Sequence, residues 1–511
     1  MVLKRLFSGI VALFLAVFLY ACASGGSVDI LAVEAELLDL IPRFVNDDFD
    51  LPEIRGVEIV WKHGDEVLED RFDYVSPMIE TRTDITASVR NGLSTSTLSF
   101  PITLVPAESG RNARVLRIET DVPLEQIGRD DYVGANLMAT TDRNGESDLE
   151  LVTDRLVMRG RGNSSWFTYP KKSYRLKFDE KTSLFGMTPS RDYVLLSEYG
   201  DKSLLRNTIA FKLASMMEHL EWTPVTRAVE VWFNGVYEGV YTLTEQVEVH
   251  DDKIEIDTDP THVDTGYFIE LDMRFYEQGE TTGREWFTIE NVPYQIKEPK
   301  HDEPGFTTAH NAFIRNAFLD LEYALSTGRN VHEHADLANL IDYFIVMELF
   351  KNVDVGYSSV FIYKEAGDVI RMGPVWDFDI SMGNIDYIPD YGPEGFYGTQ
   401  EFKNRWFRML MQDDTMRMAF KTRFEEVYDE MIPLLLDILS NLSEDIRPMA
   451  TRNFARHDIM GHYVWPNPPE IVAITTHAGH TAQIAQFIRE RADWMIETMQ
   501  GQSYLSGRLF D

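Results

Sequence analysis

The chain has one cysteine, Cys22, among 511 residues. A single cysteine can form no disulfide within the chain and no cysteine-based metal site. The 12 histidines include no His-x-x-x-His pair with a third ligand, so they are expected to be surface or structural residues. Beyond the N-terminus no segment is apolar enough to span a bilayer, and there is no internal repeat.

Basic residues are scarce relative to acidic ones. The chain has 48 Lys and Arg against 83 Asp and Glu, which gives a net charge of −35. General nucleic-acid binding requires Lys and Arg to neutralise phosphates, so we expect no nucleic-acid partner. The same excess disfavours electrostatic docking on anionic lipid. The composition is otherwise globular, and the length allows about two to four domains.

Residues 1–21 have the features of a secretory signal. Lys4 and Arg5 precede an apolar stretch of about 15 residues, which is short for a spanning helix. Cys22 follows, and a polar Ala-Ser-Gly-Gly-Ser run comes next. This arrangement resembles a bacterial lipoprotein signal, with Cys22 as the lipidated first residue of the mature protein. The alternative is an uncleaved anchor with an incidental cysteine. We therefore expect a lipid-anchored, extracytoplasmic protein of a bacterial cell envelope, either periplasmic or surface-exposed.

The remaining chain divides by pattern into four parts. Residues 22–50 are predicted to be a tether and a short helix, because apolar residues there have helical spacing. Residues 51–106 alternate as strands separated by turns, which predicts a small all-β domain of immunoglobulin-like sandwich type. Residues 113–500 mix strands and helices, and 501–511 form a tail. The fold class is therefore α+β, with helices expected over 201–220, 306–350 and 401–500.

Two acidic clusters stand out in the second half of the chain. Asn352-Val353-Asp354 ends an apolar helix, and Trp376-Asp377-Phe378-Asp379 follows a predicted hairpin. Carboxylates in apolar surroundings are costly unless a metal, a phosphate–metal complex or a proton-transfer role accounts for them. Asp377 lies 23 residues after Asp354, beyond the hairpin, which is the layout that protein kinases use for a catalytic Asp and a metal-binding Asp. Taken singly, each Asp could instead cap a helix or a turn.

A glycine-containing segment near residue 160 is the second candidate. Arg161-Gly162-Asn163-Ser164 is followed by Lys171 and Lys172. Backbone N–H groups of such a turn can approach phosphates, and the nearby cations supply charge. The alternative is a hairpin turn with solvated basic residues.

Together these motifs resemble the CotH (spore coat protein H) kinase family over roughly residues 113–500. The resemblance rests on an ordered series of segments: 161–166, 170–174, 204–207, 234–241, 244–246, 352–354 and 373–379. It implies a divergent protein-kinase-like, two-lobed domain with a helix-rich C-terminal lobe. It also implies ATP with Mg²⁺ or Mn²⁺, and a protein substrate phosphorylated on Ser/Thr-type hydroxyls.

The resemblance assigns roles to individual residues. Asp354 is similar to the catalytic base and Asp377 to the principal metal ligand, with Asp379 as a second metal candidate. Lys172 is similar to the nucleotide-binding lysine, with Lys171 as the alternative. The remaining predicted nucleotide-binding residues are Arg161, Gly162, Asn163, Ser164, Arg206, Glu245 and Gln246. Residues 385–397 would form an activation or substrate loop, or a plain surface loop.

Three features depart from the kinase pattern. Ser359 stands five residues after Asp354, where a kinase catalytic loop places a metal-binding Asn. The predicted 201–220 helix has no mid-helix Glu to pair with the lysine, and no Gly-x-Gly-x-x-Gly loop precedes the lysine strand. Two alternatives therefore stay open: a catalytically weak, pseudokinase-like envelope scaffold, and a sugar-nucleotide transferase that uses Asp377-Phe378-Asp379 as its Asp-x-Asp motif.

Overall fold

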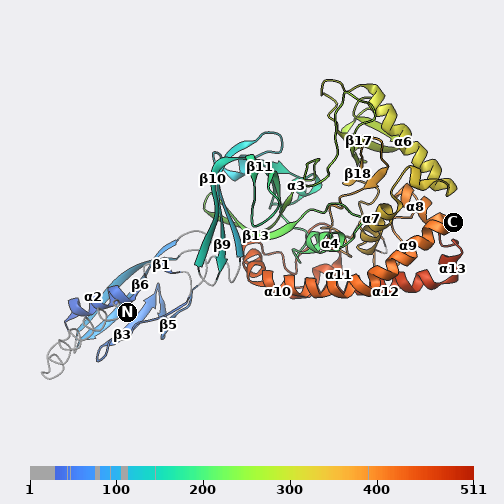
Figure 1. Cartoon of the computed structure of the whole chain (residues 1–511). Coiled ribbons are helices and arrows are strands. Elements are labelled where there is room, and N and C mark those ends of the chain that lie inside the picture. Colours follow the sequence, from blue (N-terminus) through green and yellow to red (C-terminus); the bar gives the residue numbers. More distant parts are fainter. Residues whose placement is uncertain are drawn as a thin grey trace, which may run out of the picture. The chain divides into compact units, whose positions relative to one another are not determined.

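The computed structural model (Figure 1) describes residues 29–42, 44–45, 48–74, 81–91, 94–104, 113–143, 146–389 and 391–510. The predicted signal peptide and Cys22 lie outside the described residues. Within these ranges, no helix combines the length and the apolar character that a membrane crossing requires. The chain forms two compact units, residues 1–108 and 109–511, and each is described by itself.

The described residues of the first unit form one helix and a five-stranded sheet. Asp29 caps helix α2 (Ile30–Leu40), because its carboxylate accepts the N–H of Leu31. The sheet has the order β1-β7-β6-β3-β4, and a separate two-stranded sheet pairs β2 with β5. Their bounds are β1 Phe44–Val45, β2 Phe49–Asp50, β3 Glu58–His63, β4 Glu66–Leu68, β5 Arg71–Phe72, β6 Thr81–Asn91 and β7 Ser94–Leu104. The helix is part of the core, since Leu37 packs with Trp61 and Phe100.

The second unit begins with a closed barrel of seven strands. The order around the barrel is β10-β11-β12-β14-β13-β8-β9. The bounds are β8 Ala113–Thr120, β9 Val133–Arg143, β10 Glu146–Arg161, β11 Ser173–Thr182, β12 Ser190–Leu196, β13 Thr226–Phe233 and β14 Val236–Glu245. Asn234 and Gly235 both have positive φ and turn β13 into β14, which confirms the predicted hairpin. The interior is filled by side chains such as Met158, Leu176 and Tyr241.

A second sheet follows the barrel, in the order β16-β17-β15-β18-β19. The bounds are β15 Tyr267–Leu271, β16 Trp286–Ile289, β17 Val292–Glu298, β18 Val360–Lys364 and β19 Ile370–Met372. Strands β18 and β19 form the hairpin expected between the two acidic clusters. Because β15 pairs with β18, the residues that follow β15 lie beside those that precede β18. Short helices η2 (Leu124–Gln126), α3 (Ser164–Thr168) and α5 (Phe275–Gln278) occupy connections.

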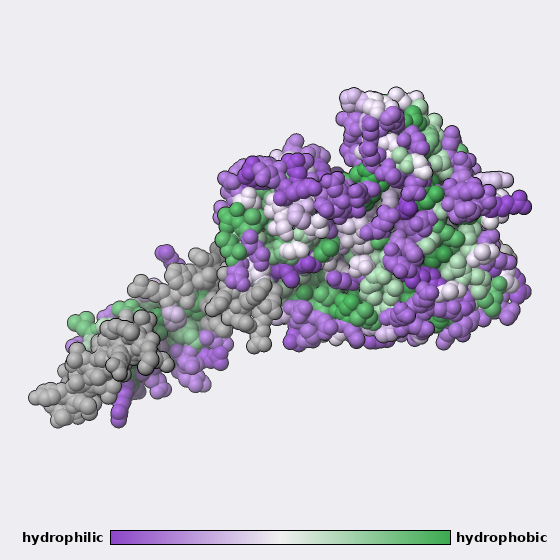
Figure 2. Space-filling view, viewed as in Figure 1, coloured by the Kyte–Doolittle hydropathy of each residue, from purple (hydrophilic) through white to green (hydrophobic). Residues whose placement is uncertain are grey.

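Helices make up most of the rest of this unit (Figure 1). Helix α7 (Leu337–Leu349) is buried from Asn339 onward, and it contacts α4 (Arg206–Ala214) and β19. Helix α10 contacts both α12 and β14, so it joins the helices to the barrel. The remaining bounds are α6 Thr308–Thr327, η3 Val331–Glu333, α8 Arg405–Gln412, α9 Asp414–Glu426, η4 Val427–Met431, α10 Ile432–Arg456, α11 Pro469–Val472, α12 His477–Gln500 and α13 Gln502–Leu505. The face seen in Figure 2 is largely hydrophilic, as the net charge of −35 leads one to expect.

The helix predicted over 201–220 is shorter in the structure. Asp201, a plausible N-cap from the sequence, is not the N-cap, which is Leu205; the Asp201 carboxylate instead accepts the N–H groups of Leu205 and Arg206, and the helix begins only at Arg206. It ends at Ala214, and the chain continues in turns. The prediction that residues 306–350 and 401–500 are mostly helical is confirmed.

Candidate active site

The structure brings the two acidic clusters together through one buried side chain, Asn352. Its amide nitrogen donates to the carbonyl oxygen of Asp377 at 2.8 Å, and its amide oxygen accepts the N–H of Asp354 at 2.8 Å. Asn352 is only 1% exposed, so both bonds are shielded from water. Asn352 therefore holds the segment that follows α7 against the segment that follows β19.

Asp377 occupies a strained backbone position. Its φ is +67°, in the left-handed region that non-glycine residues rarely adopt. One carboxylate oxygen accepts a hydrogen bond from the hydroxyl of Ser359 at 3.2 Å. The next residue is also fixed, because the N–H of Phe378 donates to the side chain of Asn207 at 2.7 Å. Strain that the surroundings maintain is a feature of functional sites.

Burial, together with the neighbouring Asp377, raises the pKa values of Asp354 and Asp379. The pKa of Asp354 is raised to about 8, first by burial and then by Asp377; Arg274 opposes this and Asp272 adds to it. The pKa of Asp379 is raised well above its ordinary value by burial and by Asp377. Crowded carboxylates of this kind are relieved by a cation.

Arg161, at the end of β10, is a predicted nucleotide-binding residue that interacts electrostatically with Asp377. Burial lowers the pKa of Arg161, and Asp377 and Glu270 oppose that effect. Its guanidinium carbon lies 5.5 Å from the ring centre of Trp376. Within the part of the chain that the structure describes, this guanidinium makes no hydrogen bond and no ion pair.

Gly162, Asn163 and Ser164 form the turn that follows Arg161. Gly162 has a φ of +101°, and a Cβ there would lie 2.6 Å from the hydroxyl of Ser165, so the tight turn requires glycine. Arg129 fastens the turn by donating to the carbonyl of Gly162 at 2.8 Å and to the side chain of Asn163 at 3.2 Å. Asn163 and Ser164 are exposed at the rim of the barrel.

The two candidate lysines have different surroundings. The ammonium of Lys172 donates to the carbonyls of Trp166 and Tyr169, both at 2.5 Å, and so holds the short α3 segment. Lys171 is 1% exposed and donates to the carbonyls of Ser197 and Val240 and to Asn453. Burial lowers the pKa of Lys171 to about 7.

Lys171 is the lysine that is linked electrostatically to the acidic segments. Burial raises the pKa of its neighbour Glu198 to about 7, while Lys171 opposes this shift. Glu198 in turn accepts hydrogen bonds from the amide of Asn207, at 3.1 and 3.2 Å, and contributes to the raised pKa of Asp379. A buried chain of polar contacts thus runs from the barrel to the segment that contains Asp377.

The other predicted nucleotide-binding residues have structural partners. Arg206 is fully buried, pairs with Asp201 and donates to the carbonyl of Ser381 and to Gln483. It therefore positions the turn that follows Asp379. At the end of β14, the Glu245 carboxylate accepts the N–H of Val225 at 2.9 Å, and burial raises its pKa. The Gln246 carbonyl accepts from Lys253 at 3.1 Å.

Sequence reasoning missed a further charged group beside Asp354. Asp272 and Arg274 follow β15 and form a pair with two contacts of 2.7 Å. Glu270 lies 3.7 Å from Arg274 and 3.0 Å from Lys297. The signal is present in the sequence, because an apolar run that ends in charged residues is the feature that singles out Asp354 as well.

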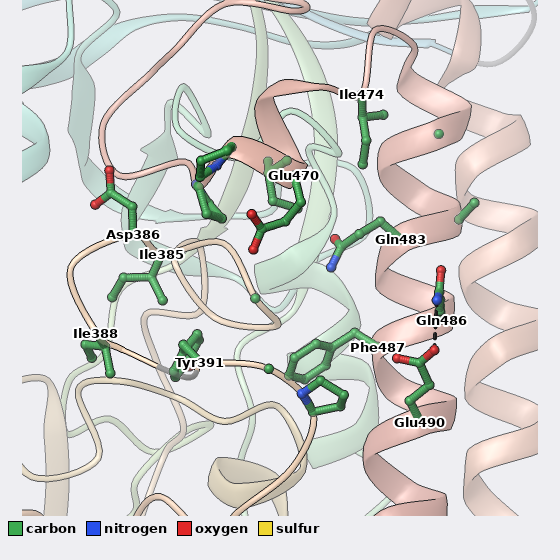
Figure 3. Close-up of a pocket in the computed structure, with 18 residues that line it drawn as sticks. Ile385, Asp386, Ile388, Tyr391, Glu470, Ile474, Gln483, Gln486, Phe487 and Glu490 are labelled. Atoms are coloured by element: carbon green, nitrogen blue, oxygen red, sulfur yellow. Dashed lines mark hydrogen bonds between the residues drawn. The ribbon is translucent and has the colours of Figure 1, made fainter.

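A cavity of about 730 Å³ lies beside the loop that follows Asp379 (Figure 3). It is bounded by this loop, by residues 468–474 and by α12. Its lining includes the carboxylates of Asp386, Glu470 and Glu490 but no lysine or arginine, and none of the predicted catalytic, nucleotide or metal residues. The cavity is therefore separate from the acidic clusters.

The fold and the candidate site describe a mixed α and β chain in which one buried asparagine joins two acidic segments. Residues 158–495 match the family described as CotH kinase protein. The match covers more than half of the chain, so the protein belongs to the CotH kinase family. The resemblance drawn from the sequence is confirmed, and family membership indicates a kinase-like function. A comparison with curated proteins found no significant match.

Proposed function

We propose that the protein is an exported, lipid-anchored CotH-type kinase that transfers the γ-phosphoryl group of ATP to Ser/Thr-type hydroxyls of envelope or surface proteins. The observation that carries the proposal is the joining of the two acidic segments by Asn352. It fixes a candidate base and a candidate metal ligand in one place. Arg161 interacts electrostatically with Asp377 and, among the described residues, its guanidinium has no hydrogen-bond or ion-pair partner, so it supports the same function by offering a cation for a phosphate.

The donor atoms fit Mg²⁺ or Mn²⁺ bound together with a nucleotide. Carboxylate and hydroxyl oxygens are the ligands that such hard cations prefer, and Asp377 with Ser359 supplies both. Among the described residues no group of three or more His, Cys, Asp or Glu side chains is arranged to hold a metal. Mg²⁺ in phosphoryl-transfer sites is held by one or two carboxylates plus substrate phosphates and waters, so this sparse set is sufficient. When bound, the cation would neutralise charge that develops on the phosphates.

Asp354 has the properties of the general base. As the acceptor oxygen forms its bond to the γ-phosphorus, the bond between that phosphorus and the β–γ bridging oxygen breaks and ADP leaves. The proton of the acceptor hydroxyl moves to the Asp354 carboxylate. A pKa near 8 lies close to a working pH, which is where general-base catalysis is efficient. Arg161 would bind and orient the phosphates meanwhile.

The test is transfer of labelled phosphate by the purified chain. Wild type should label itself or an envelope protein fraction when ATP and Mg²⁺ or Mn²⁺ are present. Asp377→Asn should reduce labelling by about a thousandfold or more, because its charge stabilises the transferring group through the cation. Equal labelling by wild type and Asp377→Asn would eliminate the metal role of this residue.

The competing functions give different results in a thermal-shift assay. A scaffold without catalysis predicts no shift with ATP and metal. A sugar-nucleotide transferase predicts a Mn²⁺-dependent shift with a sugar nucleotide and none with ATP.

The location is tested separately by Cys22→Ser. This variant should lose incorporation of labelled fatty acid and its association with membranes. A variant that keeps the lipid label would eliminate Cys22 as the anchor.

A further inference from the structure

The segment that leads into α8 is fastened to the loop that contains Asp354. Asn404, the N-cap of α8, donates its side-chain amide to the carbonyl of Val355 at 2.9 Å. Its N–H donates to the carbonyl of Gly398 at 3.1 Å, which closes the turn from the other side. Residues 400–404 are therefore part of the wall of the acidic site, although they are about fifty positions further along the chain.

Gly356 permits this close approach. A Cβ at Gly356 would lie 2.3 Å from the carbonyl oxygen of Lys403 and 2.4 Å from its carbonyl carbon. No side chain fits in that space, so the backbone of Lys403 rests directly on the second residue after Asp354. Phe402, immediately before, has a φ of +66° and is 90% exposed. A bulky residue held in the left-handed region with its ring in solvent indicates that the turn is constrained to present Lys403.

The side chain of Lys403 lies along the same wall. Its ammonium is 4.6 Å from the ring centre of Tyr397, and the hydroxyl of Tyr397 donates to the carbonyl of Val353 at 3.4 Å. Lys403 and Asp354 interact electrostatically: Lys403 opposes the rise in the pKa of Asp354, and Asp354 opposes the lowering of the pKa of Lys403 by burial. The ammonium is thus placed beside the candidate base.

Lys403 differs from Arg274 and Lys351 because, among the described residues, its ammonium has no hydrogen-bond or ion-pair partner. Arg274, the other cation that acts on Asp354, is paired with Asp272, and Lys351 donates to the carbonyls of Gly392 and Glu394. Across the described residues the ammonium of Lys403 makes no hydrogen bond and has no carboxylate within 4.0 Å; only its backbone N–H donates, to the carbonyl of Gln400 at 3.1 Å. A half-buried charge without a partner is costly, and the cost is recovered when an anion binds.

We propose that Lys403 binds the phosphoryl group that is transferred, with its ammonium against the γ-phosphate oxygens of ATP and beside Asp354. The inference rests on the proposed function and adds a catalytic residue to it. Arg161 and Lys403 would then approach the phosphates from two walls, the barrel rim and the α8 segment. ADP lacks the γ-phosphate, so Lys403 should distinguish ATP from ADP.

The experiment measures the affinities of the full chain for ATP and for ADP, each with Mg²⁺, together with kcat for labelled-phosphate transfer. Lys403→Met should weaken ATP binding about tenfold, leave ADP binding within about twofold and lower kcat by about a hundredfold. Lys403→Arg should recover part of each loss because it keeps the charge. Lys181→Met, an exposed barrel lysine, is the matched control and should change none of these values.

Gly356→Ala provides a second variant that leaves the lysine in place. The new methyl group displaces the backbone of Lys403, so ATP binding should weaken while ADP binding is kept. An unchanged ratio of ATP to ADP affinity in both variants, with wild type active, overturns the role of Lys403 and leaves the proposed function standing. A wild-type chain that binds neither nucleotide overturns the proposed function itself. Thermal unfolding checks that each variant is folded.

Discussion

Two carboxylates near the end of α7 have opposite surroundings. Glu348 is 1% exposed and fully partnered: Arg491 donates to it at 2.5 Å, and the N–H groups of Tyr397 and Gly398 donate at 2.6 and 2.8 Å. Asp354, six residues later, has no cation within 4.0 Å among the described residues, and its pKa is raised to about 8. The same stretch of chain thus carries one satisfied and one unsatisfied acid.

The difference suits two different roles: Glu348 stabilises the fold, and Asp354 is the candidate functional acid. The pair of Glu348 and Arg491 closes a network, since Arg491 also donates to the carbonyls of Pro393 and Gly395 and so fixes the loop that follows Asp379. Among the described residues, Asp354, Arg161 and Lys403 have no ion-pair partner within 4.0 Å. Buried charges are usually paired in proteins, so these three are the groups that the proposed nucleotide and cation would neutralise.

The largest expected effect comes from breaking the paired acid. Glu348→Gln leaves the buried guanidinium of Arg491 without its counter-charge, so the free energy of unfolding should fall by about 3–4 kcal/mol. Urea unfolding followed by circular dichroism measures the loss. The matched control is Asp354→Asn, which should not lower the free energy of unfolding and should abolish phosphoryl transfer. A stable Glu348→Gln variant would remove the distinction between the two acids.

Periodicity and turn chemistry were enough to predict most of the elements. The Asn234-Gly235 hairpin, the β18–β19 hairpin and the helices on either side of Asp354 follow from local sequence. Asn352 belongs to a sequence motif, but its bridging role depends on a strand pairing that brings residue 377 back to it. Lys403 gave no local signal at all, because its position depends on Gly356 and on the course of the loop between them.

Ligand binding gives the next largest effect and acts only on the unpaired region. At a nucleotide concentration about 100 times Kd, Mg²⁺ with ATP should stabilise the chain by about 2.7 kcal/mol. Removing the cation with a chelator should abolish this stabilisation. The Asp377→Asn variant should not be stabilised by Mg²⁺ with ATP. Differential scanning calorimetry measures the shift, with Glu490→Gln in the separate cavity as the control that keeps it. A full shift in the chelated protein would contradict a metal-dependent site.

The pH dependence of stability should report the unpaired acid. Asp354 is raised from an ordinary pKa of about 3.9, so between that value and about 8 the folded state binds a proton that the unfolded state does not. The stabilisation that this bound proton gives the folded state is complete below about pH 4 and is lost as the pH rises toward 8. Wild type without metal should therefore lose about 2 kcal/mol more than Asp354→Asn between about pH 6 and 7.5. Urea titrations at both pH values measure the difference. An equal change in the free energy of unfolding of wild type and Asp354→Asn between the two pH values would contradict it.

Lys171 and Lys172 show what the sequence alone cannot predict about this site. Alternation along β11 places Lys172 on the face of Tyr174, and that face is the packed interior of the barrel rather than the face toward the helices. The ammonium of Lys172 accordingly ends on two carbonyls at the barrel rim. Side-chain parity can be read from a sequence, but which face of a closed barrel meets the site cannot.

The smallest expected effect comes from replacing Arg161, which is compared with replacing Lys172, whose ammonium is hydrogen-bonded to two carbonyls. Arg161→Gln should raise KM for ATP about tenfold, equivalent to about 1.4 kcal/mol, because its guanidinium interacts electrostatically with Asp377 and has no ion-pair partner among the described residues. Lys172→Met should raise it by less than about threefold, since its ammonium already serves two carbonyls and contributes mainly to the α3 turn. Steady-state kinetics at saturating acceptor measure both. The reverse order would mean that the α3 segment releases Lys172 when nucleotide binds, and Lys172 would then be the nucleotide-binding lysine.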